Sequence, residues 1–434
     1  MVQAIRRLAC PLFAARVLAL AALFFVPIST ALTNATTLLF VVALLCAPEF
    51  WRRWRLLYRH PVGLAALLLA LAFLCSIGWG VTPMGAAFSW TLKYRKLLWI
   101  PLLIAAFAGS NWTEAARRTF FAAQLLVLVL ATSNFLRWTT IGPLYTAGFP
   151  DSHAWVFKNH ITAGIFGALF FSMALEYALG ARRTVLRVLF FILAAWILVY
   201  LFVMMQGRTG QIIAIIFCLL YGIYYVFRGQ HGVGAIAARV LLFALPCALL
   251  VGGSLFLKTD RLLQITHEYQ EYSVDNQETS VGLRIEWYRK SLQLFAHRPV
   301  LGYGVGGLQT EFDQLTEGLS GARGAPTRNP HNQFLLCAVE LGTVGVLLFL
   351  NLLVQAFRQV RPLRTSGQRL LAAYLLAFTI GCIANSLLLD FSEGNLFVLL
   401  TGILLGCAWP WTAAPPGDAA ETETWTPAKS NASR

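Results

Sequence analysis

The chain has 434 residues, of which 58% are hydrophobic and only 12% are charged. Soluble domains average about 45–50% apolar and about 25% charged residues, so this composition excludes an ordinary soluble domain. The net charge is +15, but the arginines stand mostly between apolar segments, where they set membrane topology. We therefore expect no nucleic-acid partner.

Apolar segments of roughly 20 residues recur along the chain, and each is long enough to cross a bilayer as a helix. They do not alternate in polarity, as the strands of a membrane barrel would. We predict an all-α polytopic membrane protein with about twelve transmembrane helices. The predicted spans are 10–29, 32–49, 61–80, 90–109, 115–137, 160–180, 184–205, 209–228, 236–257, 331–357, 368–389 and 395–411.

The first span follows Arg6 and Arg7 and imitates a signal peptide. Its apolar run continues without a small-residue cleavage site, so we interpret it as a retained span. With the N-terminus in the cytoplasm, the arginines of the short loops fall on the inside and twelve spans return the C-terminus there. The arginines that set this orientation are Arg52, Arg53, Arg55, Arg59, Arg117, Arg118, Arg182, Arg183, Arg228, Arg358, Arg361 and Arg364.

Four regions follow from this reading. Residues 1–257 hold helices one to nine, 258–330 form a large loop on the outer, periplasmic side, and 331–411 hold helices ten to twelve. Residues 412–434 form a disordered cytoplasmic tail.

The large loop is predicted to be partly helical. Apolar and polar residues alternate at helical spacing over 280–297, with Ser280 as the N-cap, and a second short helix is expected over 307–317. Glycines between the two helices predict a tightly turning stretch; they are Gly302, Gly304, Gly306 and Gly307.

Cationic residues on the outer side are the first candidates for a site, because topology does not require them there. Arg208 lies between glycines at the outer junction of two spans, where an arginine costs about 2.5–3.5 kcal/mol on insertion scales and is often functional. Snorkelling to headgroups is the alternative. Lys93 and Arg95, with Lys96, could attract an anionic lipid or anchor headgroups; Arg284 could bind substrate or simply be solvated on its loop helix.

The segment Asn329-Pro330-His331-Asn332 is the sharpest local feature. Asn is a good N-cap and Pro is favoured in the first helical turn, so we expect a span to begin here with His331 in its first turn. The helix dipole and nearby arginines would keep His331 neutral near pH 7, so that it can accept a proton. An ordinary capping histidine is the alternative.

Acidic residues and cysteines give weaker signals. Glu340 is expected to be paired structurally, and Asp390 and Glu393 could orient a histidine or an acceptor sugar or be solvated. All eight cysteines lie in or beside apolar segments, which predicts neither a disulfide framework nor a Cys-based metal site. No metal site and no cofactor are expected.

The element Gln206-Gly207-Arg208-Thr209-Gly210 resembles one in the O-antigen ligase and polymerase superfamily of bacterial membrane glycosyltransferases. The penultimate loop with Arg284 and Trp287, and the Gly302–Gly304 turn, resemble that family too. A third element is His331-Asn332 followed by Leu335, Glu340, Gly342 and Gly345. The resemblance is close over about 200–345.

The resemblance implies a GT-C-like, metal-independent, inverting transfer of glycan from undecaprenyl diphosphate to a sugar of the lipid A core. It implies a Gram-negative inner-membrane protein, in contact with membrane lipids, whose site faces the periplasm. Arg208 and Arg284 would hold the diphosphate, and His331 would act on the acceptor hydroxyl. Gln206, Asn332, Lys93 and Arg95 are further possible substrate contacts. An O-antigen polymerase or a protein O-oligosaccharyltransferase would use the same donor, and a secondary transporter or lipid flippase is the alternative from another class.

Overall fold

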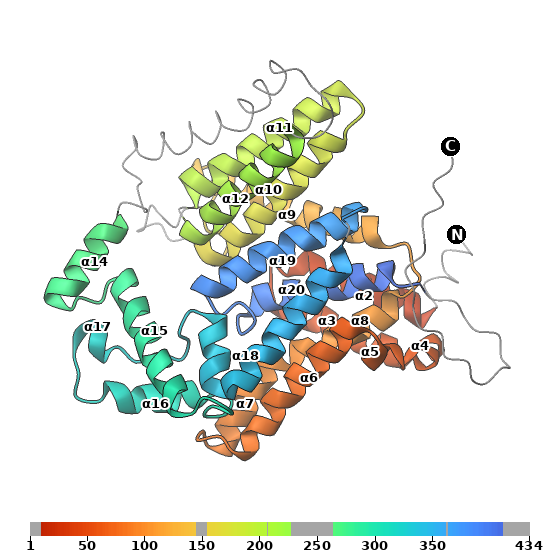
Figure 1. The fold of residues 1–434 in the computed structure, drawn as a ribbon. Coiled ribbons are helices and arrows are strands. Elements are labelled where there is room, and N and C mark those ends of the chain that lie inside the picture. Colours follow the sequence, from red (N-terminus) through yellow and green to blue (C-terminus); the bar gives the residue numbers. More distant parts are fainter. Residues whose placement is uncertain (1–9, 145–153, 206, 227–263, 362, 411–434) are drawn as a thin grey trace.

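The computed structural model describes residues 10–144, 154–205, 207–226, 264–361 and 363–410, and these residues form helices joined by turns (Figure 1). The N-terminal helices are α2 (Pro11–Phe25), α3 (Thr30–Leu45), α4 (Pro48–Arg53), α5 (Leu56–Arg59), α6 (Pro61–Cys75), η1 (Ser76–Gly78), α7 (Met84–Tyr94), η2 (Arg95–Leu98), α8 (Trp99–Phe107) and α9 (Thr113–Phe135). They are followed by α10 (His160–Gly180), α11 (Thr184–Val199), the π-helical turn η4 (Tyr200–Met204) and α12 (Arg208–Val226). The C-terminal part has α14 (Gln264–Asp275), α15 (Ser280–His297), α16 (Gly307–Thr316), α17 (Gly321–Gly324), α18 (Gln333–Val360), α19 (Ser366–Ala384) and α20 (Phe391–Ala408).

Seven helices of the described part are long and apolar enough to cross a membrane. The predicted all-α, polytopic membrane class is therefore confirmed. The seven are 61–78, 113–135, 160–180, 184–204, 333–360, 366–384 and 391–408. Shorter apolar helices cover 11–25, 30–45 and 208–224, whereas the predicted span 236–257 and tail 412–434 lie outside the described residues.

One predicted span is not a regular α-helix. Residues 90–109 do not form one continuous helix, because the chain tightens to a 3₁₀ turn at Arg95–Leu98 between α7 and α8. The ammonium of Lys96 is buried at this break and donates to the backbone carbonyls of Leu389 (3.2 Å) and Asp390 (2.6 Å). Lys96 lies in the middle of an apolar run, and a buried ammonium there needs hydrogen-bond acceptors. The carbonyls of the α19–α20 turn supply them.

The helix starts follow from local chemistry. Asn159 accepts hydrogen bonds from the N–H groups of Ile161 and Thr162 at the start of α10, and Thr365 forms a capping box with Gln368 at the start of α19. Pro61 occupies the first turn of α6, where its missing N–H costs nothing.

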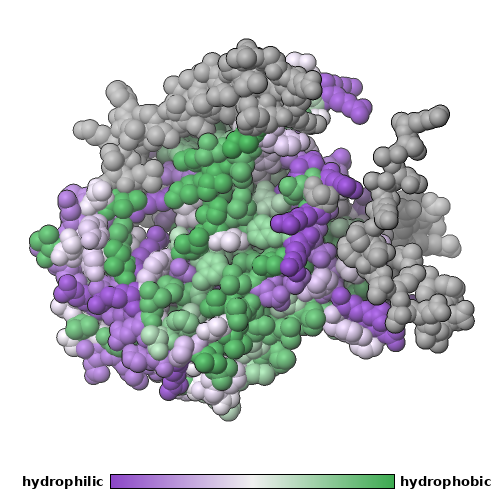
Figure 2. Space-filling model, in the orientation of Figure 1, coloured by the Kyte–Doolittle hydropathy of each residue, from purple (hydrophilic) through white to green (hydrophobic). Residues whose placement is uncertain are grey.

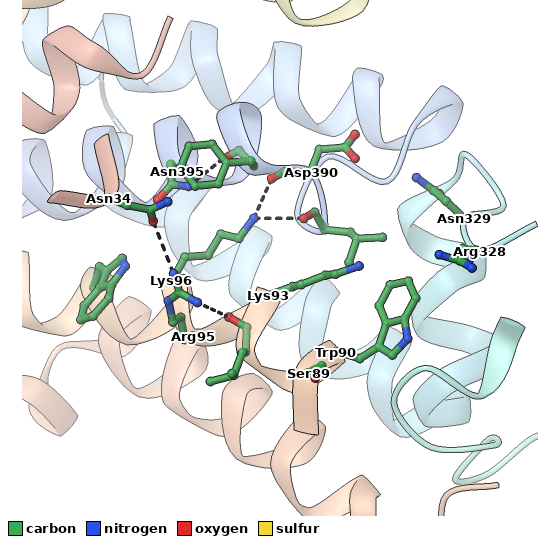
Figure 3. A pocket seen from close by; sticks show the side chains of 14 residues that line it. Asn34, Ser89, Trp90, Lys93, Arg95, Lys96, Arg328, Asn329, Asp390 and Asn395 are labelled. Carbon is green, nitrogen blue, oxygen red and sulfur yellow. Dashed lines mark hydrogen bonds between the residues drawn. The ribbon is translucent and has the colours of Figure 1, made fainter. Parts of the chain in front are cut away.

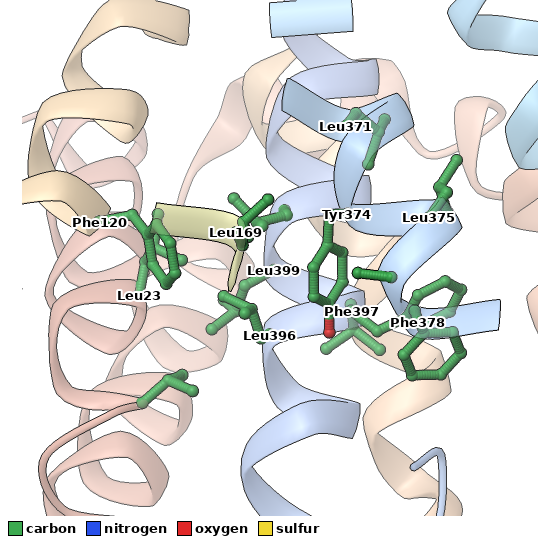
Figure 4. Packing of buried hydrophobic residues seen from close by; sticks show 14 of the residues in the cluster. Leu23, Phe120, Leu169, Leu371, Tyr374, Leu375, Phe378, Leu396, Phe397 and Leu399 are labelled. Carbon is green, nitrogen blue, oxygen red and sulfur yellow. The ribbon is translucent and has the colours of Figure 1, made fainter. Parts of the chain in front are cut away.

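A continuous apolar core joins the N-terminal and C-terminal helices. Side chains from α2, α9, α10, α19 and α20 meet in it (Figure 4), and the rings of Phe378 and Phe397 stack with centroids 4.4 Å apart. Hydrophobic side chains are exposed over the flank of the helical bundle, whereas hydrophilic ones gather over α14–α17 (Figure 2). This division fits a bundle in lipid and a polar cap beyond it.

The predicted loop helices are confirmed. Residues 280–297 and 307–316 form α15 and α16, although Thr279 rather than Ser280 caps α15 by accepting from the N–H of Gly282 (3.1 Å). The two helices pack on the start of α18 through a small apolar cluster. Its members are Leu294, Tyr303, Leu308, Phe312, Leu336 and Val339.

Two charged residues of α15, Glu286 and Lys290, are buried, although charged residues on an amphipathic loop helix are usually solvated. Glu286 accepts hydrogen bonds from the hydroxyl of Tyr272 (2.7 Å) and the guanidinium of Arg289 (2.8 Å), and Lys290 donates to the carbonyl of Arg323. These bonds hold α14, α15 and α17 together. The loop is therefore an ordered polar structure that packs on the bundle.

A kink in α18 fastens the loop to the bundle. Gly342 has φ 64° and ψ −157°, which interrupts the helix. The carbonyls of Val339 and Glu340 accept the N–H groups of Tyr303 (2.9 Å) and Gly304 (2.8 Å). The Glu340 carboxylate accepts from the N–H of Gly306 (2.8 Å) and the hydroxyl of Tyr94 (3.2 Å). The expected structural pairing of Glu340 is confirmed.

The turn at Gly304 gives a stability prediction. Gly304 has φ +78°, and a Cβ there would lie 2.3 Å from the Cα of Gly80, whereas Gly318 has φ +73° with nothing within 4 Å. We expect Gly318→Ala to cost about 1 kcal/mol through backbone strain alone. Gly304→Ala should cost about 3 kcal/mol or more, because a backbone clash adds to the same strain.

Thermal unfolding of the two variants in one detergent checks this. The Gly304→Ala variant should melt at a clearly lower temperature than the Gly318→Ala variant. Equal melting temperatures would mean that the close approach of the turn to Gly80 does not matter.

Candidate functional site

His331 lies in the turn just before α18, not in the first turn of the helix as predicted. The helix begins at Gln333, and Asn332 caps it by accepting from the N–H groups of Phe334 (2.9 Å) and Leu335 (3.1 Å). Asn329 instead stabilises the preceding turn by accepting from the backbone N–H of His331 (2.8 Å). His331 has φ +53°, a left-handed conformation that histidine tolerates better than most residues.

Three residues surround His331. Its ring stacks on that of Trp287, with centroids 5.2 Å apart and planes 21° apart. Its backbone carbonyl accepts from the hydroxyl of Tyr288 (3.0 Å), and the side chain of Asn385 lies close enough to affect the pKa of the imidazole. Trp287 and Tyr288 come from α15, whereas Asn385 ends α19, so the loop helix and the bundle together orient the imidazole.

Burial lowers the pKa of His331 below its usual 6.5, and the positive charge of Arg284 lowers it further, while the side chain of Asn385 opposes them. A lowered pKa leaves the imidazole neutral near pH 7, as expected from the sequence. The causes are burial and, as predicted, a nearby arginine. A neutral imidazole in this position can accept a proton.

Arg208 is the first residue of α12, and close backbone packing fixes its place. A Cβ on Gly210 would lie 2.5 Å from the Cα of Gly164, and one on Gly207 would lie 2.6 Å from the carbonyl oxygen of His160. The glycines that flank Arg208 therefore let α12 approach α10. This packing accounts for them without any ligand.

The guanidinium of Arg208 forms an ion pair with Glu268 of α14, with Nη2 and Oε1 2.5 Å apart. The two side chains are 19% and 18% exposed. The other oxygen of Glu268 accepts from the N–H of Val281 (3.2 Å), and its carbonyl accepts from the hydroxyl of Thr279 (2.8 Å). Sequence analysis missed Glu268, because no local pattern connects residues 60 positions apart.

Arg284 lies on α15 between Val281, which contacts Glu268, and Trp287, which stacks on His331. Burial lowers the pKa of Arg284, the Tyr288 hydroxyl opposes this, and the charge of Arg208 lowers the pKa further while Glu268 raises it. The charge of Arg284 in turn lowers the pKa of His331. The charge of Arg208 therefore acts on Arg284, and the charge of Arg284 acts on His331.

A pocket of about 680 Å³ opens beside the break between α7 and α8 (Figure 3). Lys93, Arg95, Lys96 and Arg328 supply positive charge, and Asp390 is the one carboxylate in its wall. The other residues of the wall are aromatic, polar or apolar: Asn34, Ser89, Trp90, Leu92, Trp99, Asn329, Leu389, Phe391 and Asn395. Sequence analysis singled out Lys93 and Arg95 for their charge but did not foresee this pocket.

The remaining predicted site residues have structural neighbours or lie outside the described part. Gln206 is not among the described residues. The side-chain oxygen of Asn332 is used as the cap of α18. Glu393 is buried and accepts from the hydroxyl of Thr162 (2.5 Å), so the predicted alternative of a solvated loop charge is wrong for it. In the described ranges, no three His, Cys, Asp or Glu residues are grouped to hold a metal ion.

Comparison with known proteins identifies one family. Residues 193–350 match the model of the family described as O-antigen ligase. No curated protein matches the chain. The matched stretch contains Arg208, Arg284 and His331, and it confirms the resemblance predicted over about 200–345.

Proposed function

We propose that this multi-pass membrane protein, whose residues 193–350 match the O-antigen ligase family, transfers an O-antigen glycan to a sugar hydroxyl of the lipid A core. The donor is the glycan on undecaprenyl diphosphate, and the reaction takes place on the periplasmic face of the inner membrane. The single observation that supports it best is that α15, which carries Arg284, contacts Glu268, the partner of Arg208, at Val281 and contacts His331 at Trp287, all within the matched stretch.

In this proposal the two arginines bind the diphosphate. Guanidinium groups meet phosphate oxygens through two parallel N–H bonds. Negative charge grows on the bridging oxygen as the glycosidic bond breaks, and fixed positive charge in a partly buried site stabilises it. Glu268 must yield its bond to Arg208 when the diphosphate arrives.

His331 acts as the general base. Its imidazole takes the proton of the acceptor hydroxyl, the acceptor oxygen forms a bond to the anomeric carbon, and the bond from that carbon to the diphosphate breaks. Attack from the face opposite the leaving group inverts the configuration. Undecaprenyl diphosphate leaves, and the proton on His331 passes to solvent.

A reconstituted assay tests the function. Purified protein, lipid-linked glycan and rough lipopolysaccharide should give a glycan on the core, and omission of the core should abolish product. Polymerised lipid-linked glycan without core would identify an O-antigen polymerase, and transfer to a Ser or Thr peptide would identify a protein O-oligosaccharyltransferase. Movement of lipid-linked glycan without any new bond would indicate a flippase.

The same assay after exhaustive chelation tests the proposed independence of metal. Turnover should stay unchanged, because the arginines carry the positive charge that a divalent ion would otherwise supply. Loss of activity that a single divalent ion restores would overturn this part of the proposal.

The pH dependence of kcat/KM should report on His331. The base is active when neutral, so activity falls as pH drops through its pKa, and burial together with Arg284 places that pKa below 6.5. In Arg284→Gln the positive neighbour is lost, the pKa of His331 rises, and the acid limb of the residual activity should move to higher pH. If the acid limb of the pH profile stays where it is in Arg284→Gln, a group other than His331 causes it.

A further inference from the structure

We infer that the pocket beside Trp90 binds a phosphate group on the acceptor saccharide, so that donor and acceptor each have their own cationic site. This inference rests on the proposed function, which defines the donor and the acceptor. It concerns a pocket that shares no helix with the arginines assigned to the donor. The first step is the charge balance of that pocket.

The pocket carries unneutralised positive charge. Across the described ranges, no ion pair joins a carboxylate to Lys93, Arg95, Lys96 or Arg328. Lys93 Nζ lies 3.3 Å from the centroid of the Trp90 ring, and Arg95 donates to the side-chain oxygen of Asn34 (3.3 Å) and to the carbonyl of Leu92 (3.3 Å). Burial lowers the pKa of Lys93, the charges of Glu340 and Asp390 oppose this, and the charge of Arg328 lowers it further.

Asp390 is the only acid in the pocket wall, and it does not cancel these charges. Burial raises the pKa of Asp390, and the neighbouring Glu393 raises it further, which weakens its negative charge near neutral pH. Lys96 adds little to this charge, because its buried ammonium donates to the carbonyls of Leu389 and Asp390 and burial lowers its pKa to about 7. Three cations, Lys93, Arg95 and Arg328, facing at most one carboxylate suit a ligand with about two negative charges. A phosphate monoester carries about −1.5 to −2 at pH 7.

The rest of the wall fits a sugar. Trp99 and Phe391 contribute aromatic rings to the wall, and Asn34 and Asn329 retain their amide N–H groups for hydroxyl groups after their oxygens accept from Arg95 and from the N–H of His331. A volume of about 680 Å³ is within the range of small-ligand pockets. Figure 3 shows Trp90, Lys93 and Arg328 on one side of the pocket and Arg95 with Asn34 on the other.

The position of the pocket favours the acceptor over the donor. Its wall comes from α3, α7, η2, the starts of α8 and α20, the α19–α20 turn and residues 328–329, whereas the proposed donor arginines belong to α12 and α15. Asn329 lines the pocket and also binds the backbone N–H of His331. The pocket therefore reaches within two residues of the proposed base. Inversion needs the acceptor on the side opposite the diphosphate, and the base must reach the acceptor.

The test uses full-length protein in detergent and compares Lys93→Gln and Arg328→Gln with Arg298→Gln. Lys93 and Arg328 are exposed, so their loss should not unfold the protein. Arg298 is an equally exposed cation over an aromatic ring, with Cζ 4.7 Å from the Tyr303 centroid, but it lies outside the pocket. Each variant is assayed with phosphorylated core acceptor and with the same acceptor after phosphatase treatment.

We expect Lys93→Gln and Arg328→Gln to raise the KM for phosphorylated acceptor about tenfold, as loss of a charged hydrogen bond would, and to leave the KM for donor unchanged. With dephosphorylated acceptor the wild type should already show the raised KM, and the two variants should add nothing to it. Arg298→Gln should match the wild type throughout. A raised KM for donor, or equal weakening with both acceptors, would overturn the inference.

Calorimetric titration with deacylated phosphorylated core oligosaccharide, without donor, separates the inference from the proposed function. Binding that Lys93→Gln weakens supports the pocket even if no acceptor gives product. Transfer to the core with no such binding supports the proposed function and refutes this pocket.

Discussion

Replacing His331 by Asn should lower kcat by about 10²–10⁴, the contribution of a general base. Asn is the sharper replacement, because the residue has φ +53° and Asn accepts a left-handed backbone. The Asn side chain cannot take the acceptor proton. His331→Ala should abolish transfer as well, but it combines the loss of the base with backbone strain.

The measurement is single-turnover transfer in reconstituted membranes, with expression and melting temperature recorded for each variant. His297→Asn is the matched control, because His297 is exposed at the end of α15, and its activity should equal that of the wild type. Substantial activity in His331→Asn would remove this residue from the role of base.

Arg208→Lys should reduce turnover by about 10²–10³, by analogy with loss of one donor to a developing oxyanion. Lysine keeps the positive charge and can still pair with Glu268, but it lacks the planar fork that binds two phosphate oxygens. The defect therefore reports geometry rather than charge.

Arg289→Lys is its control. Arg289 belongs to α15 and pairs with Glu286 (2.8 Å) in the structural cap, so the same replacement should change turnover less than twofold. Full activity in Arg208→Lys would indicate that Arg208 only anchors headgroups. Comparable losses in the two variants would point to general damage to the loop.

Periodicity and apolar length predict the helices whose bounds depend on residues close in sequence. The bounds of α15 and α10 follow from the apolar pattern, and the structure reproduces them. The break at Arg95–Leu98 was missed, because Lys96 is satisfied by carbonyls near residue 390, almost three hundred positions away. Hydropathy cannot detect such a partner.

The candidate site shows the same division. His331 was found because its neighbours in sequence are distinctive, although the choice of cap was wrong: Asn329 and Asn332 are equally good caps, and only packing selects between them. Glu268, Asn385 and the pocket around Trp90 escaped detection because their partners come from other elements. Long-range polar contacts create the environment of each reactive group, and no single segment encodes them.

The ion pair between Arg208 and Glu268 has a consequence for the reaction cycle. If Arg208 receives the diphosphate, one anion replaces another, and binding gains only the difference between the two interactions. The departing lipid diphosphate faces the same competitor, since the carboxylate stays tethered to the start of α15 through the N–H of Val281. Because Glu268 competes for Arg208, the lipid diphosphate product is bound less tightly and is exchanged more readily for a new donor.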